Sequence, residues 1–339
     1  MMKVTTVGLD LAKSVFTLHG VDERGHTVLR KTVRRAKLLE VFAQLPSCVV
    51  GMEACSGAQH WARELRKLGH APRIMAAEFV EPYRQGGKND ANDAAAICEA
   101  VSRPKMHFVA VKSAEQQAVL AVHRLRQGLV EERTALANRL RGLLAEYGVV
   151  VSMGLDRLRR ALPEILEDGA NPIPGLAREV FGDSQQHLRE LDDRIAAYDR
   201  RIAALARASA PVQRLMRIPG VGPVTATALV ASVGDAKVFD NGRQFATWLG
   251  LTPRQHSTGG KQRLGVMTKH GDVYLRTLLI HGARAVLRVT PKQRDAKSRW
   301  AESLRRRRPD NVVAVALAAK HARISWALLA RDKDYEIAA

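Results

Sequence analysis

Residues 86–95 read GGKNDANDAA, and the alanine-rich run that follows, Ala94 to Val101, predicts a helix. Asp90 and Asp93 stand three residues apart at the start of that run. At this spacing the two carboxylates project from one helical face, with Cβ atoms roughly 5–6 Å apart. Acids so close repel each other unless a cation sits between them. The stretch therefore indicates a metal site, and the alternative is that these residues are ordinary helix caps.

The chain before this stretch has the pattern of an α/β domain. Short apolar or alternating runs predict strands at residues 4–9, 15–21, 28–33, 48–52 and 72–75, with helices at 37–45 and around 61–68. The order is three strands, helix, strand, helix, strand, helix. It favours a ribonuclease-H-like domain, in which the first strands pair antiparallel and later strands are reached by helical crossovers.

Two further acids end strands of this predicted sheet. Asp10 ends the first strand, and Glu53 follows the apolar run at 48–52. Ends of central strands lie close together in such a sheet, so we expect both acids to meet Asp90 and Asp93. Four carboxylates form an oxygen-only site that suits Mg²⁺ or Mn²⁺ rather than zinc. Two such ions can activate an attacking oxygen and stabilise a leaving one in phosphoryl transfer.

The charge balance points to a polyanionic partner. The 339 residues include 54 Lys and Arg against 34 Asp and Glu, a net charge of +20 with a pI near 10.5. Nucleic acid is the first candidate and an acidic membrane surface the second. The sequence has no continuous run of about 18 apolar residues and no signal peptide, which disfavours the membrane. Three cysteines without a CxxC pair predict reduced thiols in a cytoplasmic protein.

The middle of the chain, residues 113–208, has a helical heptad pattern. One seam comprises Leu188, Leu191, Ile195, Tyr198, Ile202 and Leu205, and a second comprises Val122, Leu125, Leu129, Leu136, Leu143 and Tyr147. Between them, Asn171-Pro172-Ile173-Pro174-Gly175 excludes a continuous helix. We expect an antiparallel helical hairpin or coiled coil that pairs protomers, or a plain helical bundle within one chain.

The last segment, residues 209–339, carries three candidate nucleic-acid contacts. Residues 217–223 read RIPGVGP, a turn typical of a helix-hairpin-helix, where Gly220 and Gly222 let backbone N–H groups approach a phosphate. Lys261 ends a polar loop. The basic tail at 292–308 ends in four consecutive arginines and is expected to bind nucleic-acid backbone: Arg305, Arg306, Arg307 and Arg308.

These motifs together resemble a known family. The set Asp10, Glu53, Asp90 and Asp93 is similar to the DEDD tetrad of RuvC-like Holliday-junction resolvases. With GGKNDANDA, the turn near Gly220, GLTPRQHSTGGK at 250–261 and LGVMTKHGDVYLRTLLIHGARA at 264–285, the chain resembles the DEDD insertion-sequence transposases of the 110/1111 family. The resemblance covers essentially the whole chain. It implies a RuvC-like catalytic domain at 1–112, a helical hairpin at 113–208 and a mainly helical C-terminal transposase domain at 209–339.

The resemblance also implies a mechanism. A serine of the C-terminal domain is the nucleophile in that family, and it corresponds here to Ser257, with Thr258 as the neighbouring alternative. A transient phosphoserine bond to DNA is then expected, with Mg²⁺ or Mn²⁺ on the tetrad activating serine and phosphate. His256 is either a proton carrier or a simple loop histidine.

The partners implied are donor and target DNA, a structured guide RNA and further copies of the chain as a dimer or tetramer, with no membrane. The expected location is the bacterial cytoplasm, at the nucleoid. Two other functions stay open at this point. One is a hydrolytic Holliday-junction-type nuclease in which water replaces Ser257, and the other is a non-catalytic nucleic-acid-binding derivative.

Overall fold

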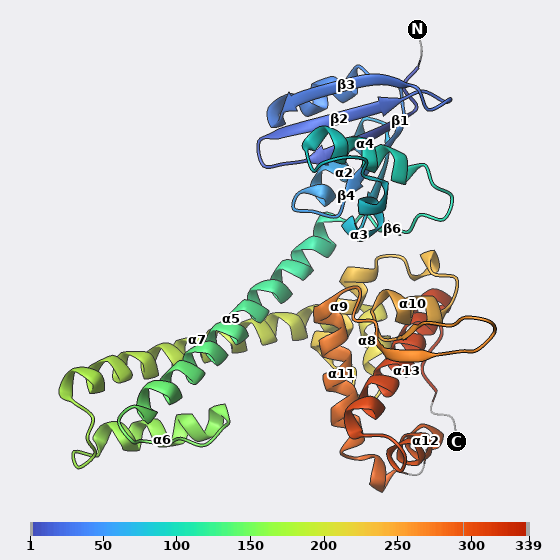
Figure 1. Cartoon of the computed structure of the whole chain (residues 1–339). Helices are drawn as coiled ribbons and strands as arrows, with labels where there is room; N and C mark the ends of the chain where they lie inside the picture. The colour runs from blue at the N-terminus through green and yellow to red at the C-terminus, as the bar shows by residue number, and fades with distance from the viewer. Residues whose placement is uncertain (1–2, 294, 337–339) are drawn as a thin grey trace. The chain divides into compact units, whose positions relative to one another are not determined.

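The computed structural model describes residues 3–293 and 295–336, which group into two compact units, residues 1–114 and 115–339 (Figure 1). The first unit is α/β and the second is mainly helical. The division into three domains expected from the sequence stays a prediction.

A six-stranded sheet forms the centre of the first unit, with strand order β3-β2-β1-β4-β5-β6. The strands are β1 (Thr6–Leu11), β2 (Val15–Val21), β3 (Thr27–Arg34), β4 (Val49–Glu53), β5 (Ala71–Met75) and β6 (Phe108–Val109). Strands β1, β2 and β3 pair antiparallel, β4 lies parallel to both β1 and β5, and β6 is antiparallel to β5. This mixed sheet is consistent with the ribonuclease-H-like domain expected from the element order.

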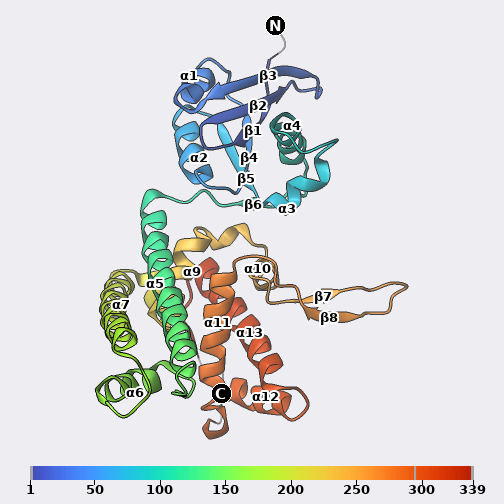
Figure 2. The ribbon, with the colours of Figure 1, turned by 60° about the vertical axis from the view of Figure 1, so that its left-hand side comes forward.

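Helices cover both faces of this sheet (Figure 2). They are α1 (Leu38–Ala43), α2 (Ala58–Lys67), α3 (Ala77–Val80) and α4 (Asp90–Val101), with 3₁₀ turns η1 (Arg35–Lys37) and η2 (Glu81–Tyr83). Alternation along β1 and β4 sends Val7, Leu9, Val50 and Met52 into a core shared with α1 and α2. The intervening residues of the same strands face α4.

Three helices of the second unit form an arm: α5 (Ala114–Ala145), α6 (Leu155–Glu167) and α7 (Gly175–Arg207). Arg126 pairs with Asp199 and Arg133 with Asp192, so α5 and α7 run antiparallel. The seam expected on α7 is largely buried, with Leu191 fully inside. The seam expected on α5 is partly wrong.

On α5 the structure turns Leu125 and Leu143 outward, where they are 58% and 44% exposed. The helix does bury Leu129 and Leu136 of the predicted seam, together with Ala137, Leu140 and Leu144, against α6 and α7. A strict seven-residue repeat shifts by about 20° per repeat around a straight helix, so the buried stripe of a long helix need not follow such a repeat along its whole length.

Six helices and a two-stranded ribbon complete the second unit. They are α8 (Ala210–Met216), α9 (Pro223–Val233), α10 (Gly242–Trp248), α11 (Val273–Leu287), α12 (Ala296–Arg305), α13 (Asp310–Arg331), β7 (Pro253–Gln255) and β8 (Leu264–Met267), with 3₁₀ turns η3 (Ala236–Val238) and η4 (Thr290–Lys292). The helices share one hydrophobic core. The β7–β8 ribbon projects from the helices (Figure 2).

A buried histidine ties the arm to this helical core. The Thr227 hydroxyl donates to the Pro223 carbonyl at 2.7 Å, so it accepts from His123 Nε2 at 2.9 Å. The Tyr274 hydroxyl then donates to His123 Nδ1 at 3.0 Å. Burial lowers the pKa of His123 to about 4, so the ring is neutral at physiological pH and α5 is fixed to α9 and α11.

Helix α13 is long and apolar enough to span a membrane, the one such helix among residues 3–293 and 295–336. Half of that stretch is buried within the protein, and Val313, Leu317 and Ala318 belong to the core of the second unit. Packing in this core accounts for the helix's composition.

Candidate active site

The alternation of the two central strands places Asp10 and Glu53 on the sheet face that α4 covers. Leu9 and Met52 point to the opposite core, so their neighbours along the strand point to α4. Asp10 lies inside β1, one residue before its end, and Glu53 is the last residue of β4. Asp90 begins α4. The alternation of side chains along β1 and β4, together with the position of α4, thus brings the four acids of the tetrad to one edge of the first unit.

Two glycines allow α4 to lie directly on the strands. A Cβ atom on Gly8 would stand 2.0 Å from the Ala94 carbonyl oxygen and 2.5 Å from the Cys98 nitrogen. A Cβ on Gly51 would stand 2.8 Å from the Val101 Cβ. Sequence reasoning missed both residues, although a glycine inside a strand is a recognised signal of close backbone approach.

The cap of α4 is Asn89, not one of the aspartates. The Asn89 side chain accepts from the Asn92 backbone nitrogen at 2.8 Å, and Asn92 Nδ2 donates to the Gly87 carbonyl at 2.7 Å. The asparagines and glycines of the stretch at 86–95 thus order the start of the helix. Asp90 and Asp93 lie in the first turn of α4 and do not cap the helix, so capping does not explain their presence.

Burial and mutual repulsion act on the carboxyl groups. The pKa of Asp10 rises to about 6, first because the group is half-buried and then because Asp90, Asp93 and Glu53 are negative neighbours. Burial and Asp93 also raise the pKa of Glu53, while Lys88 and Arg84 oppose the rise. The four carboxyl groups therefore interact electrostatically, as groups that share a site do.

The chemistry of the donor set fits a hard divalent cation, since all its ligands are carboxylate oxygens. The side chains as they lie do not form a coordination sphere: among residues 3–293 and 295–336, no three acidic, histidine or cysteine side chains converge closely enough to hold an ion. Asp93 Oδ1 is instead 3.4 Å from Arg84 Nη1. The four acids supply suitable ligand atoms and lie near one another. Their side chains would have to move in order to coordinate a metal ion.

Ser257 lies in the second unit, on the exposed connection between β7 and β8. Its Oγ accepts from Gln255 Nε2 at 2.9 Å and from the Arg263 backbone nitrogen at 3.2 Å. Two donors at one hydroxyl oxygen favour the anionic over the neutral form of such a group. Thr258 bridges to Lys261 across the turn at the ribbon tip.

The base of this ribbon is fixed by a buried arginine and two glycines. Arg276 Nη1 donates to the carbonyl oxygens of Leu249 at 3.3 Å and His270 at 3.1 Å. Gly250 and Gly271 both have positive φ, +68° and +86°, and any Cβ there would stand 2.0 Å or less from a facing carbonyl. The ribbon therefore projects from a rigid base.

The two glycines expected to contact phosphate differ in their surroundings. Gly220, with φ +86°, packs against α11, and a Cβ on it would stand 2.6 Å from the Gly282 carbonyl oxygen. Gly222 is exposed at the N-terminus of α9, with nothing near its Cβ position. Gly220 has a packing role in the fold, and Gly222 is the residue whose backbone is open to a ligand.

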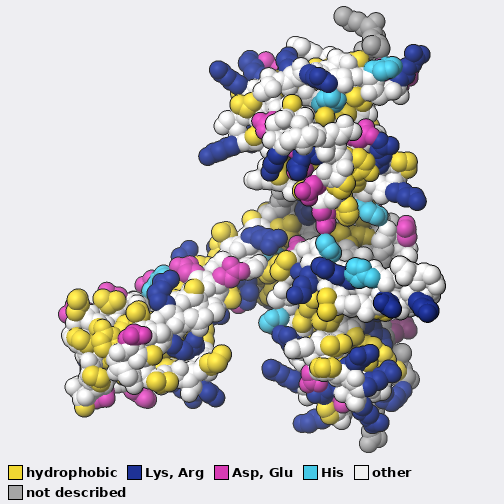
Figure 3. Space-filling view, in the orientation of Figure 1, with side chains coloured by type: hydrophobic (Ala, Val, Ile, Leu, Met, Phe, Trp, Pro, Cys, Tyr) yellow, Lys and Arg dark blue, Asp and Glu magenta, His cyan; other side chains and the backbone are white. Residues whose placement is uncertain are grey.

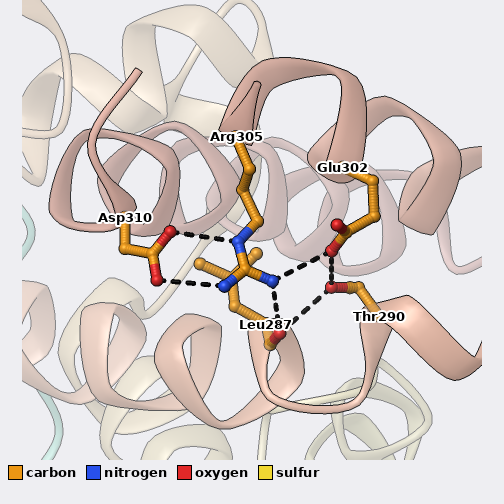
Figure 4. Close-up of polar contacts among 5 residues, drawn as sticks. All are labelled: Leu287, Thr290, Glu302, Arg305 and Asp310. Carbon is orange, nitrogen blue, oxygen red and sulfur yellow. Dashed lines mark hydrogen bonds and ion pairs between the residues drawn. The ribbon is translucent and has the colours of Figure 1, made fainter. Parts of the chain in front are cut away.

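The basic run is not a flexible tail. Apart from residue 294, which lies outside the described residues, 292–308 comprise the end of η4, helix α12 and the turn before α13. Arg305 donates through Nε and Nη2 to both oxygens of Asp310, each at 3.0 Å, and through Nη1 to Glu302 at 3.1 Å (Figure 4). The Leu287 carbonyl and the Thr290 hydroxyl complete the cluster. These hydrogen bonds hold the ends of α11 and α12 against the start of α13.

Arg306, Arg307 and Arg308 follow in the turn, and all three are exposed. They differ from Arg305, whose guanidinium is engaged by two carboxylates of its own chain. The sequence alone could not separate one structural arginine from three exposed ones, because the partners come from α12 and α13.

Comparison with known proteins supplies a family. Residues 7–149 match a transposase model for the DEDD domain of IS110 elements, and residues 212–298 match the model described as "Transposase IS116/IS110/IS902 family". The chain is 53% identical to a "Probable family 20 transposase" of Pseudomonas aeruginosa, over 98% of this chain and 99% of that protein.

Two other relatives have names that specify mobile elements. The chain is 43% identical to the "Transposase for insertion sequence element IS1111A" of Coxiella burnetii, over 100% of this chain and 93% of the relative. It is 39% identical to the "Transposase for insertion sequence element IS1328" of Yersinia enterocolitica, over 96% and 97%. The chain belongs to the IS116/IS110/IS902 family of insertion-sequence transposases.

Proposed function

We propose that this transposase cuts and rejoins DNA through a transient phosphoserine bond made by Ser257, with Mg²⁺ or Mn²⁺ held by Asp10, Glu53, Asp90 and Asp93. The observation that carries the proposal is that Asp10 and Glu53 lie on the sheet face that α4 covers, near Asp90 and Asp93 in the first turn of α4, so that burial and then these three acids raise the pKa of Asp10. A DEDD transposase domain implies divalent metal use in general. The oxygen-only donor set favours the two ions named.

The residues of the chain have separable roles in this scheme. Bound metal ions would polarise the phosphate and lower the cost of deprotonating the attacking hydroxyl. Gln255 and the Arg263 N–H hold the Ser257 oxygen and favour its anionic form. The acids belong to the first unit and Ser257 to the second, so the proposed reaction needs residues of both units, whether from one protomer or from two.

A covalent adduct tests the proposal. Wild type and Ser257→Ala are expressed with the element's flanking DNA, denatured, and probed for protein that carries DNA. We expect an adduct in wild type, none in Ser257→Ala, and an adduct in the neighbouring control Thr258→Val. Cleaved DNA without any adduct would assign the reaction to hydrolysis, and an adduct that is absent only in Thr258→Val would move the nucleophile to Thr258.

The proposed partners are donor and target DNA and a structured guide RNA at the nucleoid. The guide comes from the family resemblance, and a net charge of +20 supports contact with both polymers. Aromatic residues are only 5% of the chain, which favours backbone contacts over base stacking. Candidate contacts are Gly222 at the start of α9, Lys261 on the ribbon, and the three exposed arginines at 306–308.

We also propose that the helical arm assembles protomers. It exposes large apolar side chains on the α5–α6 connection and at the start of α7: Val150 at 86%, Met153 at 88%, Leu176 at 74% and Val180 at 50%. Figure 3 shows hydrophobic side chains gathered at the outer end of this arm. Exposed apolar surface of this kind is typical of an interaction site, and light scattering of the purified chain checks for a dimer or tetramer.

Replacing arginines of the basic run is expected to separate stability from binding. Ser at 306–308 removes exposed cations, so the slope of log K against log salt on duplex DNA should flatten by about 0.9 for each phosphate that the variant no longer neutralises. Arg305→Ser should leave that slope unchanged and lower the melting temperature, because Asp310 and Glu302 lose their partner. Fluorescence anisotropy across a salt series and thermal unfolding measure the two effects.

The Arg305 pair also predicts a pH dependence. Its guanidinium lowers the pKa of Asp310 in the folded state, so the pair stabilises the protein fully above the ordinary carboxyl pKa and loses that effect progressively as the pH falls from there through the lowered folded-state pKa. Arg305→Ser should therefore lower the melting temperature at pH 7 more than at pH 3. An equal decrease at both values would show that Arg305 acts through packing alone.

A further inference from the structure

The tetrad has a cationic neighbour that belongs to none of the motifs described above. Arg84 follows η2, in the segment that leads to α4. Its Nη1 lies 3.4 Å from Asp93 Oδ1, and its Nη2 lies 3.7 Å from Glu81 Oε1. The side chains of Arg84 and Asp93 are only 27% and 20% exposed. The guanidinium is thus held at the edge of the acid cluster by the chain itself.

The charge of Arg84 also acts on Glu53. Arg84 and Lys88 both lower the pKa of Glu53, against the effects of burial and of the Asp93 charge. Lys88 is exposed, and its effect on Glu53 is that of a nearby charge. Of these two cations Arg84 is the one in ion-pair contact with a tetrad carboxylate.

We propose that Arg84 is the resident counter-ion of the carboxylate cluster, and that a divalent cation must displace its guanidinium from Asp93 in order to bind. This inference rests on the metal site proposed above. A carboxylate oxygen that accepts from a guanidinium has less capacity left for a metal ion, and the two cations repel each other at the same oxygen. The contact leaves Asp93 engaged by a cation of its own chain.

The displacement has two opposite consequences. Without metal, the guanidinium offsets repulsion among four carboxylates and stabilises the folded first unit. With metal, the same positive charge lowers the affinity of the site, because part of the binding free energy is used to break the Arg84–Asp93 pair. Removing the guanidinium should therefore tighten metal binding and destabilise the metal-free protein, a combination that a simple structural role does not produce.

Calorimetric titration of the full chain with Mn²⁺, without nucleic acid, tests the inference. Arg84→Gln should bind Mn²⁺ about three- to tenfold more tightly than wild type, and its metal-free form should melt at a lower temperature. Arg84→Lys keeps the charge without the planar fork, so its affinity should fall between the two. This variant preserves the test if Arg84→Gln fails to fold.

Two control variants separate the contact from general charge. Lys88→Gln removes a nearby charge that lowers the pKa of Glu53, so it should tighten Mn²⁺ binding less than Arg84→Gln does. Arg103→Gln removes an arginine just after α4 that pairs with Glu99, and it should leave Mn²⁺ affinity unchanged.

The outcomes distinguish this inference from the metal site on which it rests. If wild type binds Mn²⁺ and Arg84→Gln binds it equally or more weakly, Arg84 is not a competitor and the inference is wrong. An equal gain in Lys88→Gln would also overturn it, because the Asp93 contact would then be irrelevant. If wild type and Asp93→Asn show the same Mn²⁺ titration, or neither binds Mn²⁺, the metal site itself is refuted.

Discussion

Asp10→Asn is expected to lower DNA strand cleavage by roughly a thousandfold while the protein still binds DNA. A metal ion in phosphoryl transfer contributes several kcal/mol, and each 1.36 kcal/mol corresponds to a tenfold change in rate. Asparagine keeps the shape of the side chain and loses the anionic oxygen. Binding depends on cations elsewhere on the surface, so its affinity and salt slope should stay at the wild-type values.

The same variant should make the metal-free protein more stable. Burial and the three neighbouring acids raise the pKa of Asp10 to about 6, so its carboxylate is unfavourable in the folded state at neutral pH. A neutral amide removes that repulsion, and the melting temperature at pH 7 should rise. Loss of activity with a gain of stability is the behaviour expected of an active-site charge.

Glu64→Gln is the matched control, since Glu64 pairs with Lys67 on α2 and does not act on the pKa of Asp10. It should leave cleavage unchanged. Cleavage retained in Asp10→Asn, measured on labelled DNA with Mg²⁺ present, would remove Asp10 from the metal site. A lower melting temperature in that variant would show that the carboxylate has a structural partner instead.

Gly8→Ala is the second change with a large expected effect. The added Cβ would stand 2.0 Å from the Ala94 carbonyl oxygen, and a backbone atom cannot move aside as a flexible side chain can. Helix α4 must therefore shift away from β1. Overpacking of this kind costs about 1–3 kcal/mol, and the shift also carries Asp90 and Asp93 away from Asp10.

We therefore expect Gly8→Ala to lower the free energy of unfolding and to abolish cleavage together. Alanine normally stabilises a chain relative to glycine where the backbone permits it, so the sign of the effect is diagnostic. Gly87→Ala is the control, because nothing lies within 4 Å of its Cβ position. Urea unfolding followed by circular dichroism measures the decrease. An unchanged midpoint in Gly8→Ala would mean that α4 does not lie on β1 as described.

Local pattern was sufficient for much of the first unit. The alternation of Val7 and Leu9 with Gly8 and Asp10 has a period of two, and a strand with that period must send Asp10 to one face. The continuous apolar run before Glu53 identified a central strand in the same way. Such patterns depend only on residues near one another in the chain, so they could be read before any contact was known.

Contacts between distant segments decided the rest. Leu125 and Leu143 are exposed although they continue a heptad, because α6 and α7 cover a different side of α5. His123 on α5 is engaged by Thr227 on α9 and Tyr274 on α11, more than a hundred residues away in the chain. Neither outcome follows from a periodicity, because each depends on which elements meet.

The sequence by itself determined the order of strands β1 to β5 with helices α1, α2 and α4, the excess of positive charge and the presence of four acids at or next to these elements, but not α3, β6 or the β7–β8 ribbon. Only the tertiary structure decided that α4 lies against β1 through Gly8, and that Arg84 forms an ion pair with Asp93. The physical reason is range. Strand alternation and helix capping are local properties of a few neighbouring residues, whereas close backbone approach and charge pairing depend on atoms that folding brings together.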